Sequence, residues 1–311
     1  MLYNLSLFGE QVRLLRKRQE YSQSIISEKT CINIETLRKI ENGKVIPRLD
    51  TLEALSIALK EDITALLLKY RLDDYTLFNN IKHLLELKLD RNEYETLSTV
   101  IDDLNKLKPL VNNDYYKIQI QHIYCFIEGA MLYKVHNDPQ NAYTKLINAL
   151  KINNQEFTMK RYKAYIYSSI ELRILMNIAF VTNDLGNTTS YLEIIQFCFD
   201  SVDLENRLYP KLCHNLATAY KRNNDYIKAL KYANLGIKYC KKNNQFSGLH
   251  ILYYGKGVIE HYLDDPEYVS SVKKAIFICE LLDYKKVRKK ILKNCREFLK
   301  CEYDFEKHSI T

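Results

Sequence analysis

The sequence predicts an all-α protein, and three observations support this fold class. The 8 Gly and 5 Pro residues fill only 13 of 311 positions, about a third of ordinary usage, so few residues are available for the tight turns of a sheet-rich fold. Apolar residues recur with helical spacing and without the alternation typical of strands. Hydrophobic residues (47%) and charged residues (27%) have the balance of a globular chain that buries its own core without metals or disulfides.

Residues 1–69 are expected to form a first domain of five short helices. Polar residues that can cap helix N-termini stand at four of the expected starts: Ser6, Ser22, Asn33 and Asp62. The third helix is predicted over residues 34–41, with Leu37 and Ile40 on its buried face. Gly43 is expected to end this helix, because glycine accepts the left-handed conformation that commonly closes one.

Residues 22–47 resemble a helix-turn-helix of the phage-repressor type, with a Ser-Gln start, a turn and a second helix ending in Glu-x-Gly. The first turns of such a second helix enter the major groove, where Asn, Thr, Arg and Lys can meet base edges and Ile a thymine methyl group. The start of the preceding helix can hold a phosphate. We therefore expect contacts to double-stranded operator DNA from Gln23, Asn33, Ile34, Glu35, Thr36, Arg38, Lys39 and Lys44. Two alternatives stay open: Arg38 is a plain surface charge, and Glu41 hydrogen-bonds within the domain instead of reading bases.

Residues 70–311 are expected to form a second domain of helical-hairpin repeats. Brief polar breaks near residues 137, 184, 223 and 264 recur about every 39–47 residues, a spacing typical of such repeats. Small and aromatic residues of the best copy match the tetratricopeptide pattern: Ala217, Tyr220, Ala229, Ala233 and Gly236. Two copies before it are weaker, and a fourth around residues 257–276 is degenerate. An irregular helical bundle is the alternative.

A repressor-type helix-turn-helix followed by tetratricopeptide-like helices resembles the RRNPP family of Gram-positive regulators (Rgg, PlcR and PrgX type). The resemblance covers nearly the whole chain in architecture, and by motif it rests on residues 22–47 and 212–236. It implies a cytoplasmic homodimer that binds a palindromic promoter site, and a short imported signalling peptide on the concave surface of the repeats. The peptide would shift the orientation of the two DNA-binding domains through the connection at residues 68–77.

Side chains on the expected concave face suit a peptide. In a tetratricopeptide hairpin, positions 2, 6 and 9 of the first helix line that face. The alignment puts Arg173 and Lys211 at position 2 of successive repeats, and Asn177 and Asn215 at position 6. Cations can hold a carboxylate, and Asn can donate to and accept from an extended peptide backbone. Four further residues could complete the wall: Glu128, Phe180, His214 and Thr218. The alternative is that the two Asn only satisfy hydrogen bonds between helices.

No catalytic or cofactor motif is recognisable, so we expect no enzymatic activity, cofactor or metal. The seven His are scattered, and neither HExxH nor GxSxG nor a complete phosphate loop occurs. The eight cysteines form no CxxC pair and are interpreted as buried, reduced thiols: Cys31, Cys125, Cys198, Cys213, Cys240, Cys279, Cys295 and Cys301. No apolar stretch reaches the ~20 residues that span a membrane, and the N-terminus lacks the order of a signal peptide, so a cytoplasmic location without membrane contact is expected.

The net charge of +8 permits nucleic-acid binding, and its densest basic run is C-terminal. This run comprises Lys285, Lys286, Arg288, Lys289, Lys290, Lys293, Arg296 and Lys300. Both a solvated helix face and a second contact to DNA or RNA fit it. The predicted function is a transcriptional regulator controlled by a peptide. Two alternatives remain: a ligand-independent repressor whose repeats only dimerise, and a regulator whose repeats bind another protein.

Overall fold

The computed structural model describes residues 3–70, 75–111, 113–297 and 299 of the chain. Every regular element in these ranges is a helix and none is a strand, which confirms the all-α class. The chain divides into two compact units, Met1–Leu84 with Val100–Ile120, and Leu85–Thr99 with Gln121–Thr311. Three helices are divided between the units: α6 (Tyr75–Asp90), α7 (Ser98–Leu107) and α8 (Asp114–Lys134).

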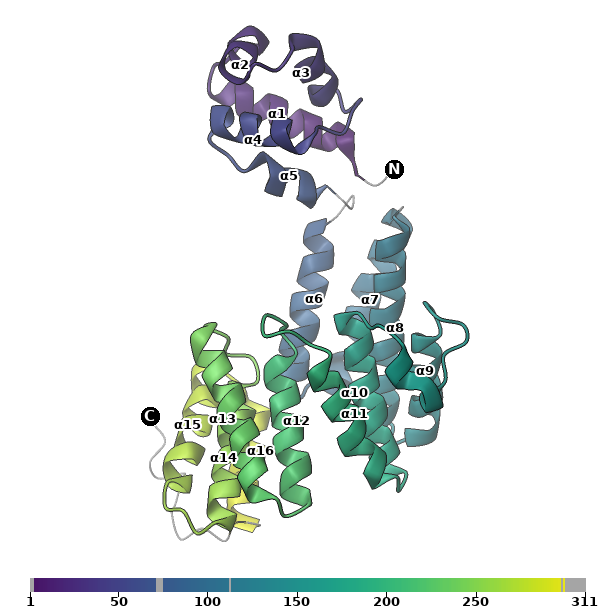
Figure 1. Ribbon diagram of the computed structural model, residues 1–311, viewed down its shortest axis with the longest axis vertical. Coiled ribbons are helices and arrows are strands. Elements are labelled where there is room, and N and C mark those ends of the chain that lie inside the picture. The colour runs from purple at the N-terminus through teal and green to yellow at the C-terminus, as the bar shows by residue number, and fades with distance from the viewer. Residues whose placement is uncertain (1–2, 71–74, 112, 298, 300–311) are drawn as a thin grey trace. The chain divides into compact units, whose positions relative to one another are not determined.

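Five short helices form the start of the first unit, as predicted (Figure 1). They are α1 (Leu5–Arg18), α2 (Gln23–Thr30), α3 (Ile34–Glu41), α4 (Leu49–Leu59) and α5 (Ile63–Lys69). Helix α3 packs against both α1 and α2, and its Leu37 and Ile40 lie in a core with Phe8, Val12 and Ile26. This core fixes α3 by one face and leaves its other face outside.

Local capping chemistry explains where these helices begin. Ser22 accepts a hydrogen bond from the backbone N–H of Ile25 at 3.1 Å, and Asp62 accepts one from Ala65 at 2.7 Å. The prediction for the start of the first helix was wrong by two residues: Asn4, and not Ser6, is the N-cap of α1. Both residue types cap well, so the choice depends on where Leu5 and the rest of α1 enter the core.

Two glycines let α1 and α3 approach each other closely. A Cβ on Gly9 would lie 2.7 Å from the carbonyl oxygen of Glu41, a distance that real side chains do not adopt. Gly43 has a φ of +66° and closes α3 in the left-handed conformation, as predicted. A Cβ there would also meet the backbone of Leu5 at 2.7 Å. The end of α3 is therefore fixed against α1 by backbone contact.

The remaining helices follow the predicted hairpin pattern. They are α7 (Ser98–Leu107), α8 (Asp114–Lys134), α9 (Pro139–Leu150), α10 (Ser169–Asp184), α11 (Thr188–Asp200), α12 (Tyr209–Arg222), α13 (Tyr226–Lys242), α14 (Leu249–Tyr262), α15 (Tyr268–Leu281) and α16 (Lys285–Glu297). Three 3-10 helices complete the elements: Tyr94–Thr96, Lys108–Leu110 and Met159–Ala164. The polar breaks predicted near 137, 184, 223 and 264 are the turns inside the hairpins α8/α9, α10/α11, α12/α13 and α14/α15.

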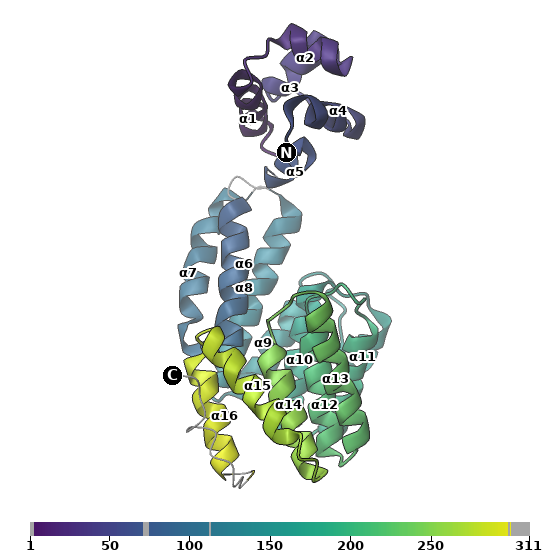
Figure 2. The same ribbon diagram turned by 90° about the vertical axis from the view of Figure 1, so that its left-hand side faces the viewer.

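Small residues allow the two helices of a hairpin to pack tightly. Figure 2 shows α12, α13 and α14 side by side. In the best-predicted copy, Ala217, Ala229 and Ala233 are buried together in one cluster. A Cβ on Gly236 would lie 2.8 Å from the Cβ of Cys213. The degenerate copy nevertheless forms a complete hairpin, α14/α15, in which Gly257 faces Val272 and the backbone of Tyr268.

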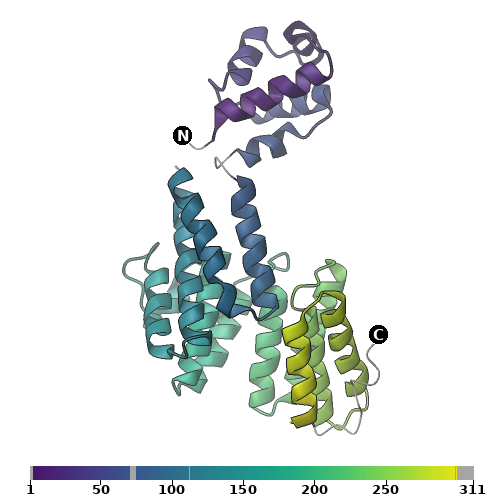
Figure 3. The same cartoon turned by 180° about the vertical axis from the view of Figure 1, so that it is seen from behind.

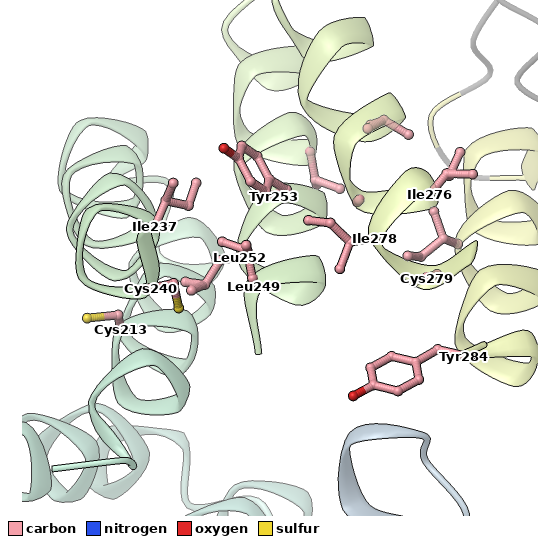
Figure 4. Close-up of a cluster of buried hydrophobic side chains, with 14 of the residues drawn as sticks. Cys213, Ile237, Cys240, Leu249, Leu252, Tyr253, Ile276, Ile278, Cys279 and Tyr284 are labelled. Atoms are coloured by element: carbon pink, nitrogen blue, oxygen red, sulfur yellow. The ribbon is translucent and has the colours of Figure 1, made fainter. Parts of the chain in front are cut away.

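A hydrophobic core runs through the last hairpins and ends on α16, which lies beside α15 in the view from behind (Figure 3). Leu252 of α14 and Ile276 of α15 lie in this core, and Tyr284 closes it near α16 (Figure 4). No helix within the described ranges is long and apolar enough to cross a membrane.

The cysteines mostly behave as small apolar core residues. Six of them are buried and form no disulfide with another described residue: Cys125, Cys198, Cys213, Cys240, Cys279 and Cys295. Burial raises the pKa of the thiols of Cys198, Cys213, Cys240 and Cys279 to about 12. The prediction was wrong for Cys31, which is a free thiol exposed in the turn between α2 and α3. Cys301 lies outside the described residues.

Candidate DNA-binding and ligand-binding surfaces

Helix α3 presents the face predicted to read DNA. Asn33 is its N-cap and accepts a hydrogen bond from the backbone N–H of Glu35 at 2.8 Å. Six of the predicted contact residues are exposed here: Asn33, Ile34, Glu35, Thr36, Arg38 and Lys39. Lys44, in the segment after the helix, is exposed as well. The structure therefore brings these side chains to one accessible surface, while Leu37 and Ile40 point inward.

Three of the predicted DNA-contact side chains already pair with protein side chains: Arg38 and Glu35 with each other, and Gln23 with Glu41. The guanidinium of Arg38 lies 3.0 Å from the carboxylate of Glu35 one turn earlier, and both side chains are more than half exposed. An exposed pair of this kind is weak, so Arg38 can exchange it for a phosphate or base. Gln23 instead donates through Nε2 to Oε2 of Glu41 at 2.9 Å, which orients its amide within the domain.

A buried ion pair holds the end of α3 in place. Glu41 is 2% exposed and accepts hydrogen bonds from Nε of Arg16 at 2.6 Å and from its Nη2 at 2.9 Å. Arg13 adds a longer contact of 3.6 Å. The hypothesis that Glu41 bonds within the domain is confirmed. Its arginine partners on α1 were not predicted, because they lie 25 or more residues away in sequence and no local spacing links them to α3.

The residues predicted to bind a peptide lie on the first helices of three consecutive hairpins. Glu128 is on α8, Arg173 and Asn177 are on α10, and Lys211 and Asn215 are on α12. Three more of the predicted residues complete this set: Phe180 on α10, and His214 and Thr218 on α12. Each of these three helices is the first of its hairpin, which is where the repeat alignment puts the residues.

Arg173 and Lys211 converge, but on a carboxylate of the chain itself. Arg173 Nη2 lies 2.6 Å from Oε1 of Glu86, and Lys211 Nζ lies 2.8 Å from Oε2 of the same residue. Lys211 also contacts Asp90 at 3.3 Å. Both acids lie in the last turns of α6 and belong to the same unit as the hairpins. Sequence reasoning missed Glu86 and Asp90, whose four-residue spacing puts them on one helix face without indicating their distant partners.

The electrostatics of this cluster favour ionised carboxylates. Burial alone would raise the pKa of Glu86, but the charges of Arg173 and Lys211 and their hydrogen bonds lower it to about 2. The side chain of Glu86 is still 39% exposed, whereas that of Arg173 is 11% exposed. The cations are therefore the enclosed part of the cluster, and Glu86 is the part that reaches water.

The two amides differ in their surroundings. Asn177 is half-buried and donates through Nδ2 to the backbone oxygen of Arg173 in its own helix at 2.9 Å. Asn215 is 8% exposed, and its side chain makes no hydrogen bond to any residue that the structure describes. Neither amide bridges two helices there. Asn215 thus keeps its donors and its acceptor for another partner.

The remaining predicted wall residues contact their neighbours. Glu128 forms an ion pair with Lys145 of α9. The ring of Phe180 lies 5.8 Å from that of Tyr191 in α11. His214 lies next to α14, and burial, His250 and Lys221 lower its pKa to about 4. Thr218 is half-buried.

The C-terminal basic run is partly neutralised by ion pairs. Lys286 lies 3.0 Å from Glu95, and Arg288 lies 2.8 Å from Glu280. Lys289 and Lys290 are exposed on α16. Lys300, the last residue of the predicted run, lies outside the described part of the chain.

Comparisons with known proteins bear on the helix-turn-helix and on the fold of the chain. The helix-turn-helix family model matches residues 12–66. The complex of Bacillus thuringiensis PlcR with the peptide PapR7 and DNA has a TM-score of 0.71 at 20% identity, over 92% of this chain and 99% of that chain. S. thermophilus ComR with DNA and its signalling peptide ComS has a TM-score of 0.57 at 15% identity, over 91% and 97%. The pheromone receptor Rgg2 of Streptococcus dysgalactiae has a TM-score of 0.55 at 12% identity, over 94% and 99%. No curated protein sequence matches the chain.

The class of domain at the start of the chain is therefore a helix-turn-helix, the type that binds DNA. Along nearly its full length the chain shares the fold of PlcR, ComR and Rgg2. The resemblance predicted from the sequence is thus confirmed for the helix-turn-helix and for the overall fold.

Proposed function

We propose that this protein is a cytoplasmic transcriptional regulator controlled by a short signalling peptide. Residues 1–69 bind operator DNA, and residues 70–311 bind the peptide and form the homodimer. The DNA-binding part of the proposal rests on one observation about α3. Its polar face is exposed, while Glu41 and Gly43 fix its end against α1. A rigidly held helix can place the same side chains in the major groove each time it binds.

The DNA-binding part is tested by fluorescence anisotropy on DNA from the chain's own upstream region, titrated with salt. We expect Arg38→Ala to weaken specific binding about tenfold, which is the order of one base or phosphate contact. Lys17→Ala is the matched control, since Lys17 is an exposed cation on α1 of the same domain. Equal, salt-sensitive binding of wild type and Arg38→Ala to any DNA sequence would contradict the role of α3.

The peptide-binding part rests on the in-register side chains of α10 and α12. Asn177 and Asn215 offer amides to a peptide backbone, and Arg173 and Lys211 offer cations to a carboxylate. Glu128, Phe180, His214 and Thr218 would complete the wall. The PlcR and ComR complexes with which the chain shares its fold are bound to a peptide, which supports a ligand of this class.

We expect Asn177→Ala combined with Asn215→Ala to abolish binding of synthetic peptides taken from the C-termini of small neighbouring reading frames. Helicity by circular dichroism should be preserved, because neither amide bridges two helices in the described structure. Asn234→Ala, at an exposed position of α13, is the control that should bind as wild type does. Unchanged peptide affinity in the double variant would refute the amide clamp.

One observation favours the alternative of a ligand-independent repressor. Arg173 and Lys211 are already paired with Glu86, and Glu128 is paired with Lys145. Charges satisfied within the chain need no ligand. DNA binding that no peptide alters would support this alternative, in which the repeats only dimerise or bind a protein partner.

A further inference from the structure

The last turns of α6 carry an acid pair that faces the repeats. Glu86 and Asp90 are four residues apart, so they share one face of the helix. Apolar neighbours anchor this part of α6: Leu85 is 3% exposed, and Leu87 packs against the core of the last hairpins. The position of the acids is thus fixed by packing as well as by charge.

Glu86 engages two successive repeats at once. One of its oxygens binds Arg173 of α10 and the other binds Lys211 of α12, at 2.6 and 2.8 Å. The guanidinium of Arg173 also lies over the ring of Phe126, 5.8 Å from the ring centre. A carboxylate held between two enclosed cations is the geometry in which these cations would hold the carboxylate of a ligand.

We propose that Glu86 is an internal stand-in for a ligand carboxylate, and that a peptide binds by replacing Glu86 between Arg173 and Lys211 with its own C-terminal carboxylate. We call Glu86 with these two contacts the carboxylate latch. The inference rests on the proposed peptide-binding function and specifies how that site is regulated.

The charge balance of the cluster requires that the ligand carboxylate replace Glu86 and not bind in addition to it. The cluster holds two cations, Arg173 and Lys211, and two acids, Glu86 and Asp90. A third carboxylate would leave a surplus negative charge in a poorly hydrated site. Glu86 is the acid that can leave, because its side chain is 39% exposed while that of Asp90 is 8% exposed.

Release of Glu86 from the latch would also affect the part of α6 that lies beyond the site. Helix α6 is continuous from Tyr75 to Asp90, and its first part belongs to the unit that contains the helix-turn-helix.

An intramolecular carboxylate competes at high effective concentration, so a free carboxylate alone does not displace it. A peptide must add backbone or side-chain contacts, which makes the release selective.

The test uses full-length protein and a synthetic library of random heptapeptides without Asp or Glu, made once with a C-terminal acid and once with a C-terminal amide. The acid form then carries its only carboxylate at the C-terminus. We compare wild type with Glu86→Gln, which keeps the shape and removes the charge. Glu95→Gln is the matched control, because Glu95 forms an exposed pair with Lys286 at 3.0 Å in the same unit.

We expect Glu86→Gln to bind the captured acid-form peptides about tenfold more tightly than wild type does, since a competing charge-assisted pair is gone. Affinity for the amide forms should stay within about twofold, and Glu95→Gln should match wild type. Equal affinity of wild type and Glu86→Gln for the acid forms would overturn the latch and leave peptide binding intact. No capture of either form by either protein would overturn the proposed function itself.

A second measurement needs no variant and remains valid if Glu86→Gln does not fold. Hydrogen exchange of the wild-type protein with a captured acid-form peptide should show faster exchange in residues 85–90 as α6 is released. Slower or unchanged exchange there, with a peptide bound, would overturn the latch.

Discussion

The buried pair of Arg16 and Glu41 shows how one residue far from the reading face controls it. Glu41 ends α3, and its two oxygens are bound by Arg16 of α1 and Gln23 of α2. Three helices of the domain therefore meet at one carboxylate. A charge in this position is stabilising only while its partner is present, because removal of one partner leaves the other charge buried.

We predict that Glu41→Ala destabilises the helix-turn-helix domain by about 3 kcal/mol, the order found when one partner of a buried ion pair is removed. Urea unfolding of the full chain, followed through hydrogen exchange in α1–α5, measures the change. Glu35→Ala removes an exposed carboxylate whose partner is Arg38 and should cost less than about 0.5 kcal/mol. Equal effects of the two variants would contradict the structural role of Glu41.

A second residue-scale prediction concerns acid stability. His250 is 1% exposed, and burial lowers its pKa to about 4, with Lys211 assisting and Asp90 opposing. The ring of Tyr284 lies edge-on 5.1 Å away, and the pKa of nearby His214 is also lowered to about 4. In the unfolded chain the pKa of a histidine is about 6.5. Between about pH 6.5 and pH 4, the unfolded chain therefore binds protons at these histidines that the native chain does not bind.

Stability contributed by neutral His250 is therefore present above about pH 6.5 and is lost as the pH falls toward 4. The loss from this residue should reach up to about 3 kcal/mol. Urea unfolding at pH 7 and pH 4 should show a smaller pH dependence for His250→Gln than for wild type. His136→Gln, at an exposed position, should leave the pH dependence as it is. A wild-type pH dependence in His250→Gln would refute this account.

At the scale of the element, hairpin packing depends on where glycine faces a neighbour. Gly236 and Gly255 both lie inside helices, but a Cβ on Gly236 would come within 2.8 Å of Cys213, whereas one on Gly255 would first meet His214 at 3.5 Å. The same substitution should thus have opposite effects at the two positions.

We predict that Gly236→Ala destabilises the chain by about 1–3 kcal/mol through overpacking. Gly255→Ala should stabilise it by about 0.5–1 kcal/mol, because alanine favours the helix and finds room. Chemical denaturation of both variants and of wild type measures these changes in the free energy of unfolding. A destabilised Gly255→Ala would show that α12 and α14 are packed more tightly than these distances indicate.

The elements were the part of the molecule that local sequence could predict well. The turns at 137, 184, 223 and 264 and the closure of α3 at Gly43 follow from residue types that act over a few positions. The α14/α15 hairpin shows the limit, since its repeat pattern is degenerate while its packing is complete. Burial by neighbouring hairpins compensates for a weak local pattern.

The residues of the candidate DNA-binding and peptide-binding sites were predictable only in part, because local sequence does not reveal contacts between distant residues. The exposed face of α3 and the in-register positions on α10 and α12 follow from helical spacing alone. The partners Glu86 and Arg16 lie 87 and 25 residues from Arg173 and Glu41, so only the folded chain brings them together. Spacing identifies which residues share a face and not which charge they meet.

At the scale of the whole molecule, the proposed homodimer has a direct test. Light scattering of the free protein should give twice the chain mass of 36.8 kDa. A palindromic operator should bind one dimer, and a single half-site should bind more weakly, because two linked contacts act together. A mass of one chain, both free and on DNA, would exclude the dimer.

The exposed thiol in the turn before α3 makes the protein its own chemical reporter. Cys31 stands two residues before Asn33, while the other cysteines in the described ranges are buried. A maleimide dye should therefore react first at this turn, and, with the proposed binding mode, bound operator should shield it. A Cys301→Ser background removes the one thiol that lies outside those ranges. The rate of alkylation would then read operator occupancy in solution without any label on the DNA.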